Sequence, residues 1–387
     1  MRVRQYRWNQ QTGWDIALDN PFIQAQLILV FGGVEAIQAS RYEELRGLFP
    51  TAQILGCSTA GEIFQTQVLE EELVATAIQF EHTAVQGFEI QLSPAETSFA
   101  AGDRLGRQIL PHNLVHVFVL SDGLQVNGSE LVRGLMQHLP LGVTITGGLA
   151  GDGDRFQQTQ VLWNDAPQSG KVVALGLYGD RLKVGFGSFG GWEPFGPERQ
   201  ITKSHGNVLY ELDGEPALAL YKKYLGEHAA DLPASGLLFP LSLRVEASDR
   251  FLVRTILAVS EANQSLTFAG DVPEGTSAQL MRASFDRLVK GAMQAASISL
   301  QHLSGAPPEL AILISCVGRK LLLKQRIEEE VEGVQEVLGV GTNLTGFYSY
   351  GEISPFAPGA SCELHNQTMT ITTLVELCFS TLVELCS

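Results

Sequence analysis

The octapeptide GCSTAGEI at Gly56–Ile63 and the octapeptide GFYSYGEI at Gly346–Ile353 share the pattern G-x-x-[ST]-x-G-E-I, although they lie far apart in the chain. Each follows a short apolar run. Two glycines five positions apart let the backbone turn through positive φ and let a partner approach it closely. A glutamate then follows at the same place in both copies. The repeated phrase predicts two related loops that face each other across a pocket.

The sequence around each copy repeats as well. An apolar run from Leu27 is followed by a helical pattern at 40–45 and the first glycine loop. An apolar run from Ala311 is followed by an acidic helical stretch at 326–337 and the second loop. About thirty residues separate each first strand from its loop, which is the usual length of a βαβ crossover. The shared GEI favours kinship between these two units.

A middle stretch follows the same order. HVFVLSDG from His116 precedes a helical pattern at 129–138 and the glycine-rich TITGGLAGDG from Thr144. It lacks the GEI, and strand–helix–strand–glycine is common in α/β proteins, so kinship and coincidence explain it equally well. We predict an α/β protein with mixed β-sheets and helices, built on β-α-β-glycine-loop units.

Composition limits the function classes. The chain has 387 residues and a formal charge of −16, with 45% apolar and 18% charged residues, which is typical of a globular protein with room for two domains. No basic surplus is available for nucleic acid or an anionic membrane surface. We see no secretory signal and no run of membrane-spanning length, so we expect a cytoplasmic protein without membrane insertion. Five cysteines without a C-x-x-C give no disulfide framework.

Several phrases resemble the FIST family, a two-part sensory module. They are GCSTAGEIF, the SDG at 121–123, GGLAGDG, SCVGRK, GFYSYGEISPF and LHNQT, and they occur in the family's order. The resemblance covers Ala25 to Thr368. It implies two interleaved halves, a FIST N-terminal domain at 25–220 and a FIST C-terminal domain at 221–368. A C-terminal strand and a twice-repeated TLVELC occupy 369–387, and we assign no function to that repeat.

The resemblance also implies a function. FIST modules are regarded as signal-input domains that bind small ligands, with amino acids as one candidate class. The sequence leaves no kinase or cyclase segment over, so a signal would pass to a separate protein such as a histidine kinase or a cyclase. We therefore expect a sensory, non-enzymatic protein without a bound cofactor. Some family members bind haem and sense nitric oxide; in that alternative, His205 is the candidate axial ligand.

The candidate ligand-binding residues come from the glycine loops, the strand ends and two arginines. They are Cys57, Ser58, Thr59, Gly61, Glu62, Ser121, Asp122, Gly147, Gly148, Arg254, Arg319, Tyr348, Tyr350, Gly351 and Glu352.

The glutamates and tyrosines of the glycine loops admit two interpretations. Glu62 or Glu352 could hold an ammonium group while turn amides accept a carboxylate, which suits an amino acid. Each glutamate could instead close its own loop by accepting backbone N–H bonds. Tyr348 and Tyr350 combine an apolar body with a polar tip, which suits a small-ligand pocket, although core packing is the commoner use.

Arg254 and Arg319 lie in or beside apolar strands, so each needs a carboxylate partner. That partner is either a ligand or an internal residue, for which Glu62, Glu352 and Glu329 are the candidates.

Cys57 is the nucleophile candidate for an enzymatic alternative. No histidine lies near it in the sequence, and a cysteine at a strand end is usually a small buried residue. The eight histidines show no HExxH motif, so we expect no metal site.

Overall fold

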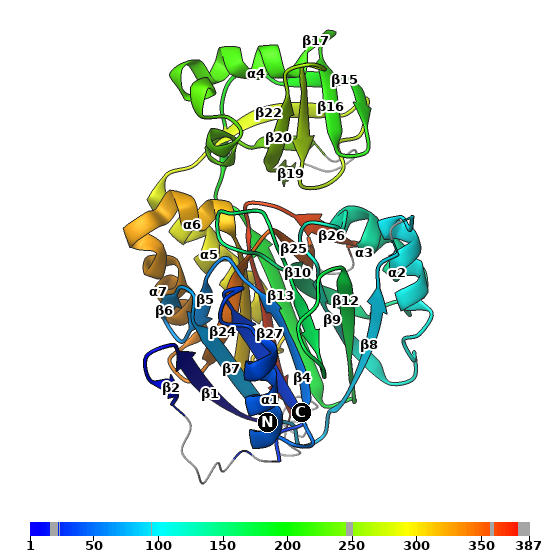
Figure 1. Ribbon diagram of the computed structural model, residues 1–387, viewed down its shortest axis with the longest axis vertical. Helices are drawn as coiled ribbons and strands as arrows, with labels where there is room; N and C mark the ends of the chain where they lie inside the picture. Colours follow the sequence, from blue (N-terminus) through cyan, green and yellow to red (C-terminus); the bar gives the residue numbers. More distant parts are fainter. Residues whose placement is uncertain (16–21, 23, 94, 245–250, 357–359, 378–387) are drawn as a thin grey trace.

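The computed structural model describes residues 1–387 apart from 16–21, 23, 94, 245–250, 357–359 and 378–387. Figure 1 shows a large core and a smaller satellite body that sits at one end of it. Within the described residues, the core contains three six-stranded sheets and the satellite body one nine-stranded sheet.

The first sheet has the strand order β11-β4-β3-β7-β1-β2. Its strands β3 and β4 are parallel and are joined by helix α1 (Ala39–Leu48), whereas β7 returns antiparallel to β3. The strands are β1 (Arg2–Asn9), β2 (Gly13–Trp14), β3 (Leu27–Gly32), β4 (Gln53–Ser58), β7 (Leu73–Gln79) and β11 (Val161–Trp163).

The second sheet has the order β26-β25-β10-β9-β12-β8. Here β9 and β10 are parallel and joined by helix α3 (Gly128–Met136), and β12 is antiparallel to β9. Helix α2 (Ser98–Gly106) packs against α3. The strands are β8 (Ala84–Gln91), β9 (Leu114–Ser121), β10 (Thr144–Leu149), β12 (Lys171–Tyr178), β25 (Gly351–Pro355) and β26 (Cys362–His365).

The third sheet has the order β6-β5-β24-β23-β27-β13. Its parallel pair, β23 and β24, is joined by α6 (Val317–Leu323) and α7 (Ile327–Leu338), with a short 3-10 turn at Lys324–Arg326, and β27 is antiparallel to β23. Helix α5 (Phe285–Leu300) packs on β13 and α7. The strands are β5 (Glu62–Phe64), β6 (Gln67–Leu69), β13 (Leu182–Phe189), β23 (Leu310–Cys316), β24 (Asn343–Ser349) and β27 (Met369–Glu376).

The three core sheets have the same strand arrangement around their parallel pair. Each sheet also includes a strand that belongs to another β-α-β-glycine-loop unit. Strand β5, after the first glycine loop, pairs with β24; β25, after the last loop, pairs with β10; and β11, after the middle loop, pairs with β4. The exchange is therefore cyclic. This common topology indicates that the core consists of three related repeats, the middle stretch included, and it confirms the mixed α/β class with interleaved halves.

Alternating side chains in the parallel strands fill the core. In β3, Leu27, Leu29 and Phe31 face a central cluster, whereas Ile28 and Val30 pack in the cluster that contains helix α1. A strand buried on both faces reads as a continuous apolar run, as this one does. Residues of β9 and β23 enter the same central cluster, so the inner faces of the core sheets meet in one apolar centre.

The first glycine of each loop is required by close packing within the parallel pair. A Cβ at Gly147 would lie 1.9 Å from the carbonyl oxygen of Val119 on the neighbouring strand, and one at Gly346 would lie 1.8 Å from that of Leu313. Both glycines have positive φ, 152° and 150°. At Gly56 the corresponding contact is 2.2 Å. The same steric need at the same position of each unit supports their kinship.

The satellite body is inserted into the third repeat between β13 and α5. Leu220, near which we expected a domain boundary, lies inside helix α4 (Ala217–Leu225) of the satellite. Because β13 pairs with β27, the chain on both sides of the insertion belongs to the core. The remaining satellite elements are β14 (Glu193–Pro194), β15 (Arg199–His205), β16 (Val208–Leu212), β17 (Glu215–Pro216), β18 (Leu241–Arg244), β19 (Phe251–Arg254), β20 (Ile256–Ser260), β21 (Ser265–Phe268), β22 (Ser277–Arg282) and 3-10 turns at Gly226–Asp231 and Ala234–Leu238.

The first TLVELC copy begins within β27, in line with the strand expected from residue 369. The second copy lies outside the described residues. No helix in the described part of the chain is long and apolar enough to cross a membrane.

We expect Gly147→Ala to lower the free energy of unfolding by about 2–4 kcal/mol, because the new methyl group would overlap the Val119 carbonyl. Urea denaturation followed by circular dichroism measures the change. Gly341→Ala is the control, since a Cβ there would meet no atom within 4 Å. Equal stability of the two variants would contradict the close-packing argument.

Candidate functional site

The glycine loops of the three repeats meet in a ring of backbone hydrogen bonds. The amide of Ala60 donates to the carbonyl of Tyr348 at 2.8 Å, and the amide of Tyr350 donates to Leu149 at 3.2 Å. The amide of Gly151 donates to Ser58 at 2.9 Å and closes the ring. Donors and acceptors occupy the same two positions of each loop. The two GEI loops therefore lie side by side, but the junction pocket described below is lined by the first loop and not by the second, so the loops do not face each other across it as expected.

Glu62 and Glu352 each close their own loop. Glu62 accepts from the Thr59 hydroxyl and from the Glu72 amide, and Glu352 accepts from the hydroxyls of Ser349 and Thr368 and from the Thr368 amide. Both side chains are fully buried. Burial raises the pKa of each carboxyl to about 8, against the opposite effect of these hydrogen bonds. Each carboxyl thus binds a hydroxyl of its own loop, but the backbone amides that they accept belong to Glu72 and Thr368, outside the glycine loops.

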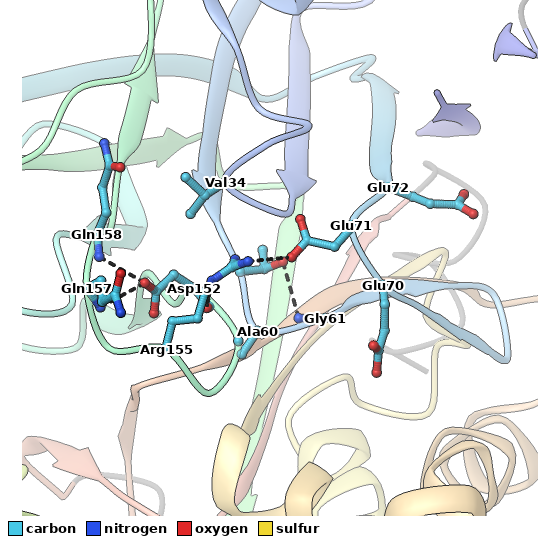
Figure 2. Close-up of polar contacts among 12 residues, drawn as sticks. Val34, Ala60, Gly61, Glu70, Glu71, Glu72, Asp152, Arg155, Gln157 and Gln158 are labelled. Carbon is cyan, nitrogen blue, oxygen red and sulfur yellow. Dashed lines mark hydrogen bonds and ion pairs between the residues drawn. The ribbon is translucent and has the colours of Figure 1, made fainter. Parts of the chain in front are cut away.

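A junction pocket of about 200 Å³ lies where the repeats meet, and its lining includes Glu62 but not Glu352. Its charged groups pair across repeats: Arg155 with Glu71 at 3.0 Å, and Lys320 with Glu70 at 2.9 Å. Figure 2 shows Arg155 reaching toward Glu71 beside the main chain of Ala60 and Gly61. Both ion pairs link side chains of different repeats, and their carboxylates are exposed. The predicted residues that line it are Thr59, Gly61 and Glu62.

The remaining loop candidates also have partners within the protein. The Ser58 hydroxyl accepts from the Gln160 amide, and the Ser121 hydroxyl donates to the Asp122 carbonyl. The Asp122 carboxylate accepts from the amides of Leu124, Gln125 and Gly170. Gly148 and Gly351 lie in packed strands, where an added Cβ would approach the side chains of Ile314 and Leu149 within 3.0 Å.

Arg319 is fully buried and pairs with Glu330 of helix α7, with Nη2 2.7 Å from Oε2. This corrects the internal partners that we considered, Glu62, Glu352 and Glu329. The Glu330 carboxylate also accepts the hydroxyl of Tyr348 at 2.7 Å, so the polar tip of that tyrosine is occupied in the core. Arg319 further donates to the Gly190 carbonyl, at the connection between core and satellite. Its role is to hold the connection in place.

Tyr350 belongs to a different environment. Its hydroxyl donates to Asp152, and its ring stacks on Phe156 with centroids 4.4 Å apart. The Asp152 carboxylate also accepts the amide of Phe156. Figure 2 shows its contacts with the amides of Gln157 and Gln158, which organise the same loop.

An interbody cleft of about 620 Å³ lies between core and satellite. Helix α3 and strand β26 supply the core wall, and strands β18 and β19 with the loop at 271–276 supply the satellite wall. Its lining residues are Ser129, Arg133, Met136, Leu243, Arg244, Leu252, Arg254, Asp271, Pro273, Glu274, Thr276, Ser361, Cys362, Glu363 and Leu364. A pocket of this size, with apolar walls and a few charged groups, is typical of small-ligand sites.

Arg254 spans the cleft. Its Nε donates to the Asp271 carbonyl of the satellite at 3.0 Å, and its Nη1 donates to the Leu364 carbonyl of the core at 2.9 Å. Burial lowers the pKa of Arg254 to about 10, so the side chain remains charged at neutral pH. Main-chain carbonyls hold the guanidinium in place within the lining of the cleft.

A second pocket, of about 300 Å³, also lies between the two bodies. We call it the aromatic pocket, because Phe156, Phe268 and Tyr350 line it. It shares Leu364 with the interbody cleft.

The positions of Cys57 and His205 do not support the two alternatives, catalysis by a cysteine and haem binding. Cys57 is fully buried in β4, and burial together with the charge of Glu62 raises the pKa of its thiol well above the usual value. A nucleophilic thiolate needs the opposite shift. His205 is exposed at the end of β15, which does not fit an axial haem ligand. No group of three or more His, Cys, Asp or Glu within the described residues is placed to hold a metal ion.

The fifteen predicted residues therefore do not form one site. Three residues with these contacts were not among the site residues predicted from the sequence: Glu330, Asp152 and Phe156. The burial of Glu330 could have been predicted, because this residue lies beside the apolar face of helix α7 formed by Ile327 and Val331. No such pattern marks Phe156.

The protein thus combines an α/β core with a second, smaller body, and pockets lie between the two. Residues 26–215 match the FIST N domain and residues 217–355 match the FIST C domain, so the chain belongs to the FIST family. FIST domains are sensory domains for which small-ligand binding is suggested. The chain is also 23% identical over 354 residues to an uncharacterized protein of Methanocaldococcus jannaschii, covering 80% of this chain and 66% of that protein.

We expect Arg319→Met to cost about 3–5 kcal/mol of stability, because it leaves the Glu330 carboxylate buried without its cation. Adding Glu330→Gln should recover much of the loss. Arg326→Met is the control, since it breaks only exposed ion pairs and should cost at most about 1 kcal/mol. Thermal melts of the wild type and the three variants give the comparison. An Arg319→Met protein as stable as the control would favour the ligand-binding interpretation of this arginine.

We expect stability to fall as pH rises from about 4.5 to 8, in part through Glu62 and Glu352. A folded-state carboxyl with a raised pKa holds its proton more tightly than the unfolded chain does. Its contribution is therefore complete below the unfolded pKa and is lost as pH rises through 8, by up to about 1.4 kcal/mol per pH unit for each group.

Urea titrations of the wild type, Glu62→Gln and Glu352→Gln between pH 5 and 9 measure this slope. Each substitution should flatten it, whereas Glu35→Gln, at an exposed position, should leave it unchanged. Identical slopes in all four proteins would mean that the buried carboxyls are ionised throughout this range.

Proposed function

We propose that this chain is a small-ligand sensor whose ligand binds in the interbody cleft. The observation that carries the proposal is that Arg254, held by one carbonyl from each body, lines the interbody cleft. A ligand that contacts both walls would change the energy of their relative position. Differential contact of that kind is what a sensor needs in order to shift a conformational equilibrium.

The charges of the cleft suit a zwitterion. Arg133, Arg244 and Arg254 can approach a carboxylate, and the carboxylates of Asp271 and Glu363 can approach an ammonium group. Apolar side chains complete the walls, among them Met136, Leu243, Leu252 and Leu364. This combination favours an amino-acid-like ligand, bound without turnover and without a resident cofactor.

The two bodies are joined through the segments at 190–192 and 283–284, between β13 and β14 and between β22 and α5. Arg319 fixes the first of these joints through Gly190, and it also donates to Leu288 near the second. We propose that ligand binding repositions the satellite about these joints and that a separate cytoplasmic partner, such as a histidine kinase or a cyclase, reads the change.

We expect common amino acids, screened at millimolar concentration, to include at least one that raises the melting temperature, because a ligand that binds only the folded state stabilises it. At one hundred times its dissociation constant the gain is about 2.7 kcal/mol. Arg254→Met should abolish that gain. Arg199→Met is the matched control, since Arg199 lies in the same satellite sheet but pairs with Asp213 outside the cleft.

A screen without any stabilising compound would count against the proposal. If it were accompanied by turnover that Cys57→Ala removes, the protein would be an enzyme.

A further inference from the structure

We infer that the aromatic pocket is the subsite that selects the ligand, and that it takes the aryl group of an aromatic amino acid whose carboxylate lies at Arg254. This inference rests on the proposed function, since it places the charged end of the same ligand in the interbody cleft.

The two pockets adjoin at Arg254. Gly270 lines the aromatic pocket, and a Cβ on Gly270 would lie 3.0 Å from Nε of Arg254 and 3.1 Å from Oγ of Ser129. Arg254 and Ser129 both line the cleft. The buried Ser129 hydroxyl oxygen has no hydrogen-bond partner in the described structure. The Arg254 guanidinium and the unpaired Ser129 hydroxyl therefore lie at the boundary between the two pockets.

The aromatic pocket differs from the cleft in its chemistry. None of the described residues that line it is charged. The core supplies Leu149 and the stacked pair of Tyr350 and Phe156, and the satellite supplies Phe268 and Leu257. Cavities of roughly 150 Å³ already accept benzene, so a volume of about 300 Å³ is ample for an aryl group. Ring faces also favour aromatic partners through offset or edge contacts.

Two leucines mark an open apolar edge of this pocket. Leu124 of the core is 41% exposed, and Leu257 of the satellite is 40% exposed. They come from opposite bodies, so an apolar group held between them would draw the bodies together. The same group would remove exposed apolar surface from water.

The loop that carries Phe156 is held in an unfavourable conformation. Phe156 has φ of 52°, which is rare for a bulky side chain. The Asp152 carboxylate fixes this loop by accepting the amides of Phe156, Gln157 and Gln158. Tyr350 donates its hydroxyl to the same carboxylate. Strained backbone conformations that surrounding contacts maintain are concentrated at functional sites. In this loop the strained conformation places the Phe156 ring against the Tyr350 ring in the pocket wall.

The test is a titration by calorimetry with L-phenylalanine, L-tryptophan, L-leucine and L-alanine. We expect the aromatic pair to bind about tenfold or more tightly than leucine. Phe156→Gly relieves the strained φ while removing the ring, and Leu257→Asn changes an exposed wall residue. Each should reduce the aromatic preference severalfold and leave alanine binding unchanged. Phe285→Ala, an exposed ring outside both pocket linings, is the control.

The outcomes separate the inference from the proposed function. If leucine and phenylalanine bind equally and both depend on Arg254, the subsite is wrong and the cleft remains the ligand site. If phenylalanine binding survives Arg254→Met undiminished, the ligand does not span the two pockets and the inference is overturned. If none of the four amino acids binds the wild type, the inference falls together with the proposed amino-acid ligand.

Discussion

The core depends on the ring of backbone hydrogen bonds that joins Ala60 to Tyr348, Tyr350 to Leu149 and Gly151 to Ser58. At each of these loops the chain leaves one sheet and enters another, so the ring also fixes the strand exchange. Among the described strands, the sheet of each repeat includes a strand from another repeat. Removing one loop would expose sheet edges in its neighbour. The interleaving thus makes the three repeats one folding unit, although they are distant in sequence.

Buried charges serve this assembly rather than a ligand at its centre. Glu62 and Glu352 satisfy loop donors, and the Arg319–Glu330 pair is enclosed in the third repeat. Burying an ion pair rarely adds net stability, but removing one partner is costly. Such groups therefore specify one arrangement of the helices and of the connection to the satellite. The arginine that reaches Gly190 couples the interior of the core to the joint about which the satellite could move.

The satellite creates pockets that the core alone does not have. Its residues supply one wall of the interbody cleft and part of the aromatic pocket, and Arg254 contacts both bodies. A site built from two bodies reports occupancy through their relative position, whereas a site inside one rigid sheet would not. Function in this family member is thus expected where packing is incomplete, at the boundary between bodies, and not at the tightly bonded glycine loops that are most conspicuous in the sequence.

The sequence by itself determined the local structure: the apolar runs, the βαβ spacing and the glycines at 56, 147 and 346, because side-chain periodicity and steric space at the Cα act over short distances. It also pointed to Arg254, since a charge within an apolar strand must find a partner. Only the tertiary structure decided that Glu330 pairs with Arg319, that the middle stretch is a repeat like the other two, and that the satellite is inserted into the last repeat, between β13 and α5. Those outcomes depend on contacts between segments that are far apart in the sequence. The spacing of residues along the chain does not indicate which of them will pack together.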